Sequence, residues 1–320
     1  MSAPDRLLVT GGLSDDDRAR LAGLVTDLAP DTAIDHVPSL ADAGALVERA
    51  TAIAGAVSPE LFGRAHDLRW VHSWAAGADG LLFPEMLDSP VALTSATGNG
   101  AVPLAEHAML LMLMLSRDAP RWQRAQHEAR WDRFPHGELA GATVGIVGLG
   151  HSGADLAAKA RAFHMRVLGL RRAAREPVPG VDREYTPAEL HTFLAAADFV
   201  VVTAPLTAQT RGMFDAAAFA AMKATAHFIC ISRGQIADDD ALLAALQDGR
   251  IAGAGLDAHG VEPLPADSPF WSLPNVIVTP HNGATTPQTK ARGVDIYLDN
   301  VRRFLTGEPL RNVVDKAAGY

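Results

Sequence analysis

The architecture of this 320-residue chain is set by one stretch, Thr143-Val144-Gly145-Ile146-Val147-Gly148-Leu149-Gly150-His151-Ser152-Gly153. The residues up to Val147 are typical of a buried strand, and those after Gly153 have the pattern of a helix. Between them lies the spacing G-x-G-x-x-G, which lets a backbone approach a pyrophosphate while the helix start presents free amides to it. In this strand–turn–helix context the motif is specific. It predicts a dinucleotide-binding turn formed by Gly148, Gly150, His151, Ser152 and Gly153.

Strand-like and helical runs alternate on both sides of this turn. Upstream, Ser14 is a candidate N-cap for a helix that ends near Ala29. Alternation of this kind predicts α/β architecture, with parallel sheets covered by helices. The expected strands are the apolar runs at 7–9, 52–57, 70–72, 91–94, 143–147, 167–170, 199–203, 227–231, 253–256 and 276–279.

The same pattern predicts two domains, since 320 residues are many for one hydrophobic core. A long helical run from Pro103 to Trp131 separates the two alternating regions, so we expect a connector helix there. The chain turns helical again after Thr285, when the second sheet already has its strands. We therefore expect two Rossmann-like or flavodoxin-like domains. Residues 1–100 plus 288–320 would form a substrate domain, and residues 101–287 a dinucleotide-binding domain.

Composition and charge argue against several classes of partner. The net charge of −9 is unsuited to nucleic acid, because such binding depends on clustered Lys and Arg. The longest apolar segment, 109–115, falls short of the roughly 20 residues of a bilayer span. Cys230 is the one cysteine, and no secretory signal is visible. We expect a cytoplasmic protein that binds neither nucleic acid nor membrane, and we assign no metal ligands.

Three separated residues could carry the chemistry. Arg233, Glu262 and His281 each follow an apolar strand-like run or the turn after one. Ligands of open parallel sheets bind outside the carboxyl ends of the strands. A guanidinium there can grip a carboxylate through two hydrogen bonds, and a carboxylate–imidazole pair can move a proton. The set predicts reduction of a 2-keto acid or oxidation of a 2-hydroxy acid.

From about Trp70 to Arg311 the sequence resembles the D-isomer-specific 2-hydroxyacid dehydrogenases. The match consists of short motifs in a fixed order, which together are highly specific. They are Ala76-Gly77-Ala78-Asp79, Ala105-Glu106-His107, the glycine turn, Ala204-Pro205-Leu206-Thr207, Ser232-Arg233-Gly234, Gly255-Leu256-Asp257, Glu262-Pro263-Leu264-Pro265 and Thr279-Pro280-His281.

The resemblance implies a role for each candidate catalytic residue. Arg233 would bind the substrate carboxylate and polarise the keto group, and His281 would donate the proton to the developing alkoxide. Glu262 would orient the imidazole and favour its protonated form. The backbone amides of Ala76 and Gly77 would hold the substrate carboxylate from the other domain.

The choice of cofactor depends on the end of the 167–170 strand. It runs into Arg171 and Arg172, with Arg175 close behind, and lacks the acid that would bind the ribose of NAD. Cations there can hold a 2′-phosphate, although a solvated basic loop is the alternative. We expect NADP(H) to be preferred, with NAD(H) possible. The resemblance adds further cofactor contacts, which are Pro205, Thr210, Ile231, Asp257 and Gly283. Among them Asp257 would accept a hydrogen bond from the nicotinamide carboxamide, or else it caps a turn.

We expect a reductase of the glyoxylate, hydroxypyruvate or broader 2-ketoacid type, working in the reductive direction. The alternative is a dinucleotide-sensing, corepressor-like binding protein on the same fold. A formate-type dehydrogenase is disfavoured, because that branch has an amide beside its histidine where this chain has Glu262. The apolar run from Pro103 to Trp131 offers a surface for a homodimer.

Overall fold

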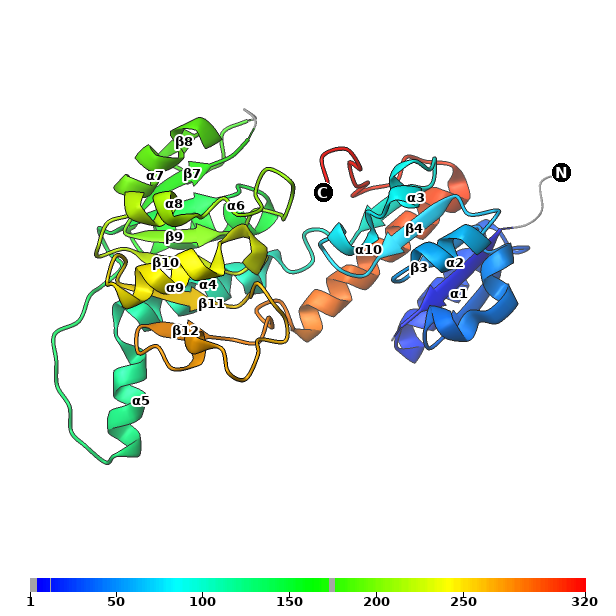
Figure 1. The fold of residues 1–320 in the computed structure, drawn as a ribbon. Coiled ribbons are helices and arrows are strands. Elements are labelled where there is room, and N and C mark those ends of the chain that lie inside the picture. The colour runs from blue at the N-terminus through cyan, green and yellow to red at the C-terminus, as the bar shows by residue number, and fades with distance from the viewer. Residues whose placement is uncertain (1–4, 12, 173–175) are drawn as a thin grey trace. The chain divides into compact units, whose positions relative to one another are not determined.

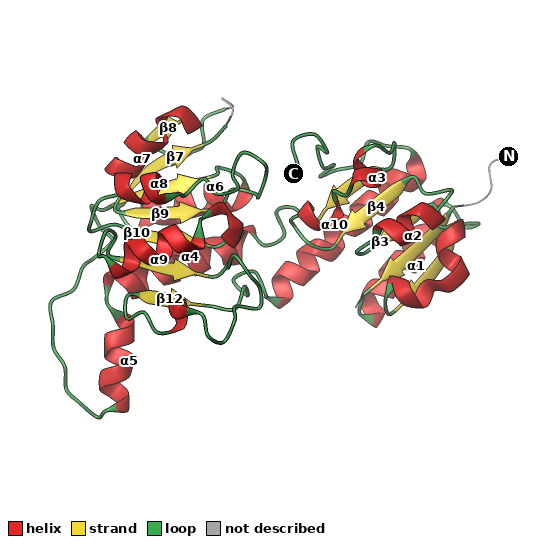
Figure 2. Ribbon diagram, viewed as in Figure 1, coloured by secondary structure: helices red, strands yellow, loops and turns green. Residues whose placement is uncertain are grey.

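The computed structural model describes residues 5–11, 13–172 and 176–320. The chain divides into two compact units, each built around one parallel sheet (Figures 1 and 2). Unit 1 comprises Met1–Asn99 and Thr286–Tyr320, and unit 2 comprises Gly100–Thr285. The expected α/β class with two parallel sheets is confirmed.

The seven-stranded sheet of unit 2 has the order β12-β11-β10-β9-β6-β7-β8. The chain runs outward from β6 to β8 on one side and then returns to β9 on the other side of β6. The order therefore reverses between β6 and β9, which is the place where open parallel sheets bind ligands. The strands are β6 (Thr143–Val147), β7 (Arg166–Leu170), β8 (Arg183–Tyr185), β9 (Phe199–Val202), β10 (His227–Cys230), β11 (Gly253–Leu256) and β12 (Val276–Val278).

Helices cover both faces of this sheet, which explains why its strands are continuously apolar. On one face α4 (Ala101–Ser116) and α6 (His151–Ala162) pack against residues such as Ile146 and Val201. The other face is covered by α7 (Leu190–Ala196), α8 (Ala216–Ala221) and α9 (Asp239–Gln247) (Figure 1). Short 3-10 turns complete the unit: η3 (Pro187–Glu189), η4 (Gly234–Ile236) and η5 (Pro269–Trp271).

The five-stranded sheet of unit 1 has the order β2-β1-β3-β4-β5. Helices α1 (Asp15–Leu28) and α10 (Pro287–Thr306) cover one face, where Tyr297 packs against Trp70. The other face is covered by η1 (Leu40–Arg49), α2 (Pro59–Arg64), η2 (Asp79–Leu81) and α3 (Pro84–Leu87). The strands are β1 (Arg6–Thr10), β2 (Ala33–Val37), β3 (Ala52–Ala54), β4 (Trp70–Ser73) and β5 (Ala92–Ser95).

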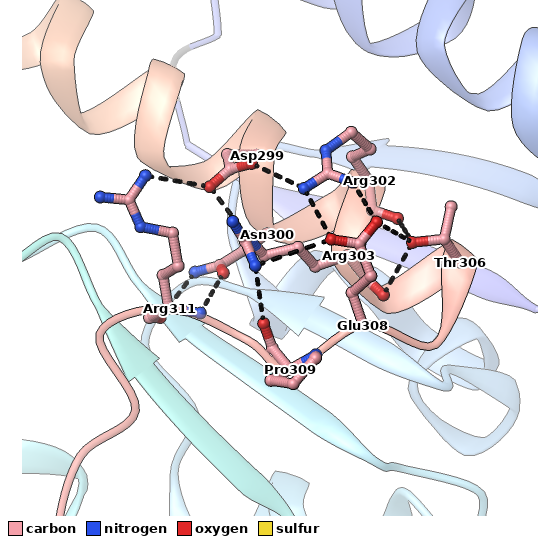
Figure 3. A network of polar contacts seen from close by, with 8 residues as sticks. All are labelled: Asp299, Asn300, Arg302, Arg303, Thr306, Glu308, Pro309 and Arg311. Carbon is pink, nitrogen blue, oxygen red and sulfur yellow. Dashed lines mark hydrogen bonds and ion pairs between the residues drawn. The ribbon is translucent and has the colours of Figure 1, made fainter.

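A polar network fixes the segment that follows α10 (Figure 3). The Asp299 carboxylate accepts hydrogen bonds from Arg302 at 3.2 Å, Arg303 at 3.0 Å and Arg311 at 3.2 Å. Asn300 is fully buried; its Oδ1 accepts from the Arg311 amide at 2.8 Å, and its Nδ2 donates to the Arg311 carbonyl at 3.0 Å. Exposed ion pairs contribute little stability. The buried Asn300 is therefore the stronger anchor of this segment.

The helix boundaries confirm one expectation and correct another. Ser14 caps α1 as expected, because its hydroxyl accepts from the Asp17 amide at 3.1 Å. The single helix expected from Pro103 to Trp131 is instead split into α4 and α5 (Ala119–His127). Between them Asp118 has a left-handed backbone, with φ of 48°, which interrupts the helical hydrogen bonds.

Candidate active site

The glycine turn after β6 has the geometry of a pyrophosphate cradle. Gly148 has φ of +99°, and a Cβ there would lie 2.7 Å from the Ala204 backbone. A Cβ on Gly153 would lie 2.0 Å from the Gly148 carbonyl oxygen, so the helix can approach the strand only with glycine here. A Cβ on Gly150 would meet no atom within 4 Å, which leaves open space above the start of α6. These are the three roles of the glycines in a dinucleotide site.

The first turn of α6 faces the same space. Gly150 is the N-cap and provides no side-chain cap, so the amides of the first turn keep their donors for an anion. His151 is exposed there, Ser152 is half-buried and Gly153 is buried. These residues fit the pyrophosphate of a dinucleotide.

The loop after β9 packs directly on this turn. Thr203 Oγ1 donates to the Gly148 carbonyl at 2.6 Å. Farther along, Thr210 Oγ1 donates to the Pro205 carbonyl at 2.7 Å, which closes the loop on itself. Pro205 and Thr210 thus belong to a segment anchored beside the cradle. Ile231, also expected to contact the cofactor, is 2% exposed and packs in the core between α4 and the sheet.

The two arginines after β7 have different environments. The Arg171 side chain is 13% exposed, and its Nη2 lies 2.5 Å from Glu184 Oε2 on the neighbouring β8. The same nitrogen donates to the Glu176 carbonyl at 3.2 Å. Arg172 is exposed. Arg175 lies outside the described residues. Of the two described arginines, Arg172 is the more accessible to a ligand.

His281 and Glu262 form a close pair. His281 Nδ1 lies 2.7 Å from Glu262 Oε2, and the two side chains are 37% and 36% exposed. The other carboxylate oxygen of Glu262 accepts from the His259 amide at 2.9 Å. Partial burial opposes ionisation of Glu262, but the His259 amide and the His281 ring outweigh it and lower the pKa of Glu262. The carboxylate is therefore charged at neutral pH, and Nδ1 of His281 is its hydrogen-bond donor.

The loop that carries Arg233 packs against the loop that leads to Glu262. A Cβ on Gly234 would lie 2.0 Å from the carbonyl carbon of His259, so the two backbones touch. Gln235 Nε2 also donates to the Gly260 carbonyl at 2.9 Å. Arg233 is half-buried, and its Nη1 donates to the Ser232 carbonyl at 2.9 Å. The three candidate catalytic residues thus lie on loops at the carboxyl ends of the adjacent strands β10, β11 and β12.

Asp257 holds the backbone immediately after His281. The side chain is fully buried, and its Oδ1 accepts from the Asn282 amide at 3.1 Å and Thr279 Oγ1 at 2.7 Å. Its Oδ2 accepts from the Gly283 amide at 3.0 Å. This support matters because His281 has φ of 49°, a left-handed conformation that costs a non-glycine residue free energy.

His107 of α4 closes this network from the helix side. Its Nε2 lies 3.0 Å from Thr279 Oγ1 and 3.5 Å from Asp257 Oδ1. Sequence reasoning assigned no role to His107 or Thr279. The available signal was that His107, with Glu106, interrupts a helix that is mainly apolar.

Ala76 and Gly77 lie in unit 1, in the loop after β4. Ala76 is exposed and Gly77 is half-exposed. Among the described residues, no group accepts a hydrogen bond from either backbone amide. Both amides are therefore available to an anion.

None of the helices in the described part of the chain combines the length and apolar character that a membrane crossing requires. The described residues also contain no cluster of three or more His, Cys, Asp or Glu side chains able to hold a metal ion.

Comparison with known proteins identifies the family. Residues 109–283 match the model of the D-isomer specific 2-hydroxyacid dehydrogenase, NAD binding domain. A glyoxylate reductase of Korarchaeum cryptofilum is 33% identical over 91% of this chain and 88% of its own. A glyoxylate/hydroxypyruvate reductase B of Citrobacter koseri is 34% identical over 91% of this chain and 90% of its own.

A solved structure is similar throughout. The NADPH-dependent glyoxylate/hydroxypyruvate reductase of Sinorhizobium meliloti, in complex with NADP and sulfate, superposes with a TM-score of 0.84 at 31% identity. The match covers 99% of this chain and 100% of that one. This chain therefore belongs to the D-isomer specific 2-hydroxyacid dehydrogenases, and it is an NAD(P)-dependent oxidoreductase.

Proposed function

We propose that this dehydrogenase reduces glyoxylate, hydroxypyruvate or another small 2-keto acid to the 2-hydroxy acid with NADPH. The observation that carries the proposal is the 2.7 Å contact between His281 Nδ1 and Glu262 Oε2, together with the packing of the Arg233 loop against the loop that leads to Glu262. The alternative of a corepressor-like binding protein is not favoured, because the similar proteins described above are oxidoreductases.

The acid–base pair defines which atom moves the proton. Because Nδ1 of His281 donates to the charged Glu262, Nε2 is the nitrogen left to give a proton to the substrate oxygen. We assign Arg233 to the substrate carboxylate, where a fixed guanidinium also polarises the keto group. The amides of Ala76 and Gly77 are assigned to the same carboxylate. The bound dinucleotide supplies the hydride that adds to substrate C2.

For the cofactor we propose a preference for NADPH, with NADH as a weaker substrate. The exposed Arg172 supports it, since a cation at the end of β7 can bind a 2′-phosphate. The similar reductase of Sinorhizobium meliloti is NADPH-dependent. In this proposal residues 101–287 form the dinucleotide-binding domain, and residues 1–100 with 288–320 form the substrate domain. Asp257 and Gly283 would shape the nicotinamide side by fixing the loop after His281.

We also propose that the protein is a cytoplasmic homodimer. Helix α5 and the segment after it extend away from the sheet of unit 2 (Figure 1). Three apolar side chains of α4, α5 and this segment are exposed: Leu110 by 48%, Trp122 by 41% and Trp131 by 91%. Exposed apolar groups of this size favour a protein partner. Elution at the 33.8 kDa of one chain at micromolar concentration would contradict the dimer.

The reaction is tested by a matrix of steady-state rates. NADPH and NADH are each combined with glyoxylate, hydroxypyruvate, pyruvate and bulkier aromatic or branched keto acids. We expect the highest kcat/KM with NADPH and a small keto acid. Tight NADPH binding without consumption of NADPH on any keto acid would instead support a sensing role.

A further inference from the structure

The loop assigned to the substrate carboxylate is braced by a hydroxyl group. We propose that Thr97 is a positioning residue that orients the peptide between Ala76 and Gly77 for carboxylate binding. The inference rests on the proposed function, in which these two amides bind the substrate. Thr97 itself does not touch the substrate in this assignment.

One hydrogen bond fixes the peptide between Ala76 and Gly77. Thr97 Oγ1 donates to the Ala76 carbonyl oxygen at 2.9 Å. In a trans peptide the C=O bond and the N–H bond of the next residue lie in one plane and point in opposite directions. A hydroxyl that holds the Ala76 oxygen therefore turns the Gly77 N–H away from Thr97. No described residue accepts from that N–H, so it remains a free donor held in a defined direction.

The Thr97 hydroxyl is itself fixed. Ser95 Oγ lies 2.6 Å from Thr97 Oγ1. Because Thr97 has one proton and gives it to Ala76, Ser95 is the donor in this pair. Ser95 is 2% exposed and sits at the end of β5, in register with Ser73 of β4. Ser73, the last residue of β4, accepts from the Ala75 amide at 3.2 Å through its Oγ.

The C-terminal segment completes the brace. Asn312 Nδ2 donates to the Thr97 carbonyl at 2.9 Å and to the Ser95 carbonyl at 3.4 Å. The neighbouring Arg311 is held by the buried Asn300 of α10 (Figure 3). The end of α10 is thus connected, through named hydrogen bonds, to the peptide assigned to the substrate. A donor fixed in this way loses little entropy when it binds an anion.

The test compares Thr97→Val with Thr97→Ser. Valine keeps the branched shape without the hydroxyl, so the Ala76–Gly77 peptide can rotate. Because one hydrogen bond that orients the peptide is lost, we expect KM for glyoxylate to rise roughly threefold to tenfold, equivalent to about 0.7–1.4 kcal/mol. We expect kcat to stay within about twofold and KM for NADPH to be unchanged, the pattern of lost substrate binding. Serine keeps the hydroxyl and should restore the wild-type KM.

Thr51→Val is the matched control. Thr51 Oγ1 donates to the Arg6 carbonyl at 3.1 Å, so this variant loses a hydroxyl–carbonyl bond of the same kind elsewhere in unit 1. Its thermal stability should fall without a change in KM for glyoxylate. If Thr97→Val does not fold, Ser95→Ala frees the Thr97 hydroxyl and should raise KM for glyoxylate about twofold to threefold.

Three results would overturn the inference. They are a wild-type KM for glyoxylate in Thr97→Val, an equal rise in Thr51→Val, or an equal rise in KM for NADPH. A wild-type enzyme that reduces no 2-keto acid would be a different failure, because it would remove the proposed function on which the inference depends.

Discussion

Arg171 Nη2 lies 2.5 Å from Glu184 Oε2, and this ion pair joins the end of β7 to the neighbouring β8. The Arg171 side chain is thereby bound to the edge strand of the sheet, whereas Arg172 is exposed. The two adjacent arginines should therefore respond differently to mutation.

For Arg172→Ala we expect the ratio of kcat/KM with NADPH to kcat/KM with NADH to fall about tenfold or more, since a charge-assisted hydrogen bond is worth roughly 1.5–3 kcal/mol. Arg171→Ala should cost about 1 kcal/mol of stability and affect both cofactors alike. Steady-state kinetics with both nucleotides measure the ratios. A larger selectivity loss in Arg171→Ala would reverse this assignment.

Removal of the proton donor should abolish most of the turnover. His281→Ala should lower kcat by about 10²- to 10⁴-fold, the usual contribution of a positioned acid. The dissociation constant of NADPH, measured by fluorescence titration, should be unchanged, because the glycine turn is intact. His191→Ala, at an exposed position of α7, is the control and should retain full activity. Unchanged turnover in purified His281→Ala would remove His281 from the mechanism.

Loss of the Glu262 charge should reduce activity without unfolding the protein. Burial opposes ionisation, yet the His259 amide and the His281 ring lower the pKa of Glu262, so in the folded protein its charge persists below its ordinary titration range. The stability from this charge is present above the unfolded pKa of about 4.3 and is lost as pH falls through the lowered folded value. Glu262→Gln should lower kcat roughly tenfold to a hundredfold at neutral pH. In this variant the free energy of unfolding should also depend less on pH below about pH 4.3, and urea unfolding at several pH values measures this dependence.

Two glycines of the turn should separate cofactor binding from folding. At Gly153 a Cβ would lie 2.0 Å from the Gly148 oxygen, so Gly153→Ala must displace α6 and lower the melting temperature. At Gly150 the added methyl enters open space, so Gly150→Ala should melt like the wild type. It should weaken NADPH binding about tenfold or more by obstructing the pyrophosphate. Equal NADPH affinity in Gly150→Ala and wild type would argue against the cradle.

The buried His72 should make unit 1 sensitive to acid. Burial lowers the pKa of His72 from 6.5 to about 3. Between these values the unfolded chain binds a proton that the folded protein excludes, so stability is complete above about pH 6.5 and falls as pH drops toward 3. The free energy of unfolding should fall by at most ~1.4 kcal/mol per pH unit because of this one group.

His72→Phe should remove this slope, and His66→Phe, at an exposed position of the same unit, should not. Urea unfolding between pH 7 and pH 4, followed by tryptophan fluorescence, measures it, because Trp70 lies 6.0 Å from the His72 ring. The same slope in His72→Phe and wild type would assign the acid sensitivity to other groups.

The sheets show why some elements were predictable. Strands such as β6 and β9 are buried on both faces and read as continuous apolar runs. Sequence reasoning missed β2 and β8, which lie at the sheet edges. Edge strands need no apolar run, and β8 reads Arg183-Glu184-Tyr185. The break at Asp118 was also missed, since it depends on a single left-handed residue inside a helical pattern.

In the site, too, some residues could be predicted from the sequence and others could not. Position after a strand, together with the family resemblance, made Arg233, Glu262 and His281 candidates, and their loops follow three adjacent parallel strands at one edge of the sheet. Contacts of Thr97 with Asn312 and of His107 with Thr279 join residues 215 and 172 positions apart. No local period records such pairs, so their roles emerge only from the fold.

Unit 1 is made of two segments that flank unit 2 in the sequence, and this has a consequence for biosynthesis. Unit 2 is complete once residue 285 has been made, but the apolar face formed by Leu7, Val9 and Trp70 waits for Val294 and Tyr297 of α10. On the ribosome, this face should therefore stay uncovered until α10 has been translated. Nascent chains arrested before residue 286 should expose this face to proteases and chaperones, and released chains that contain α10 should not.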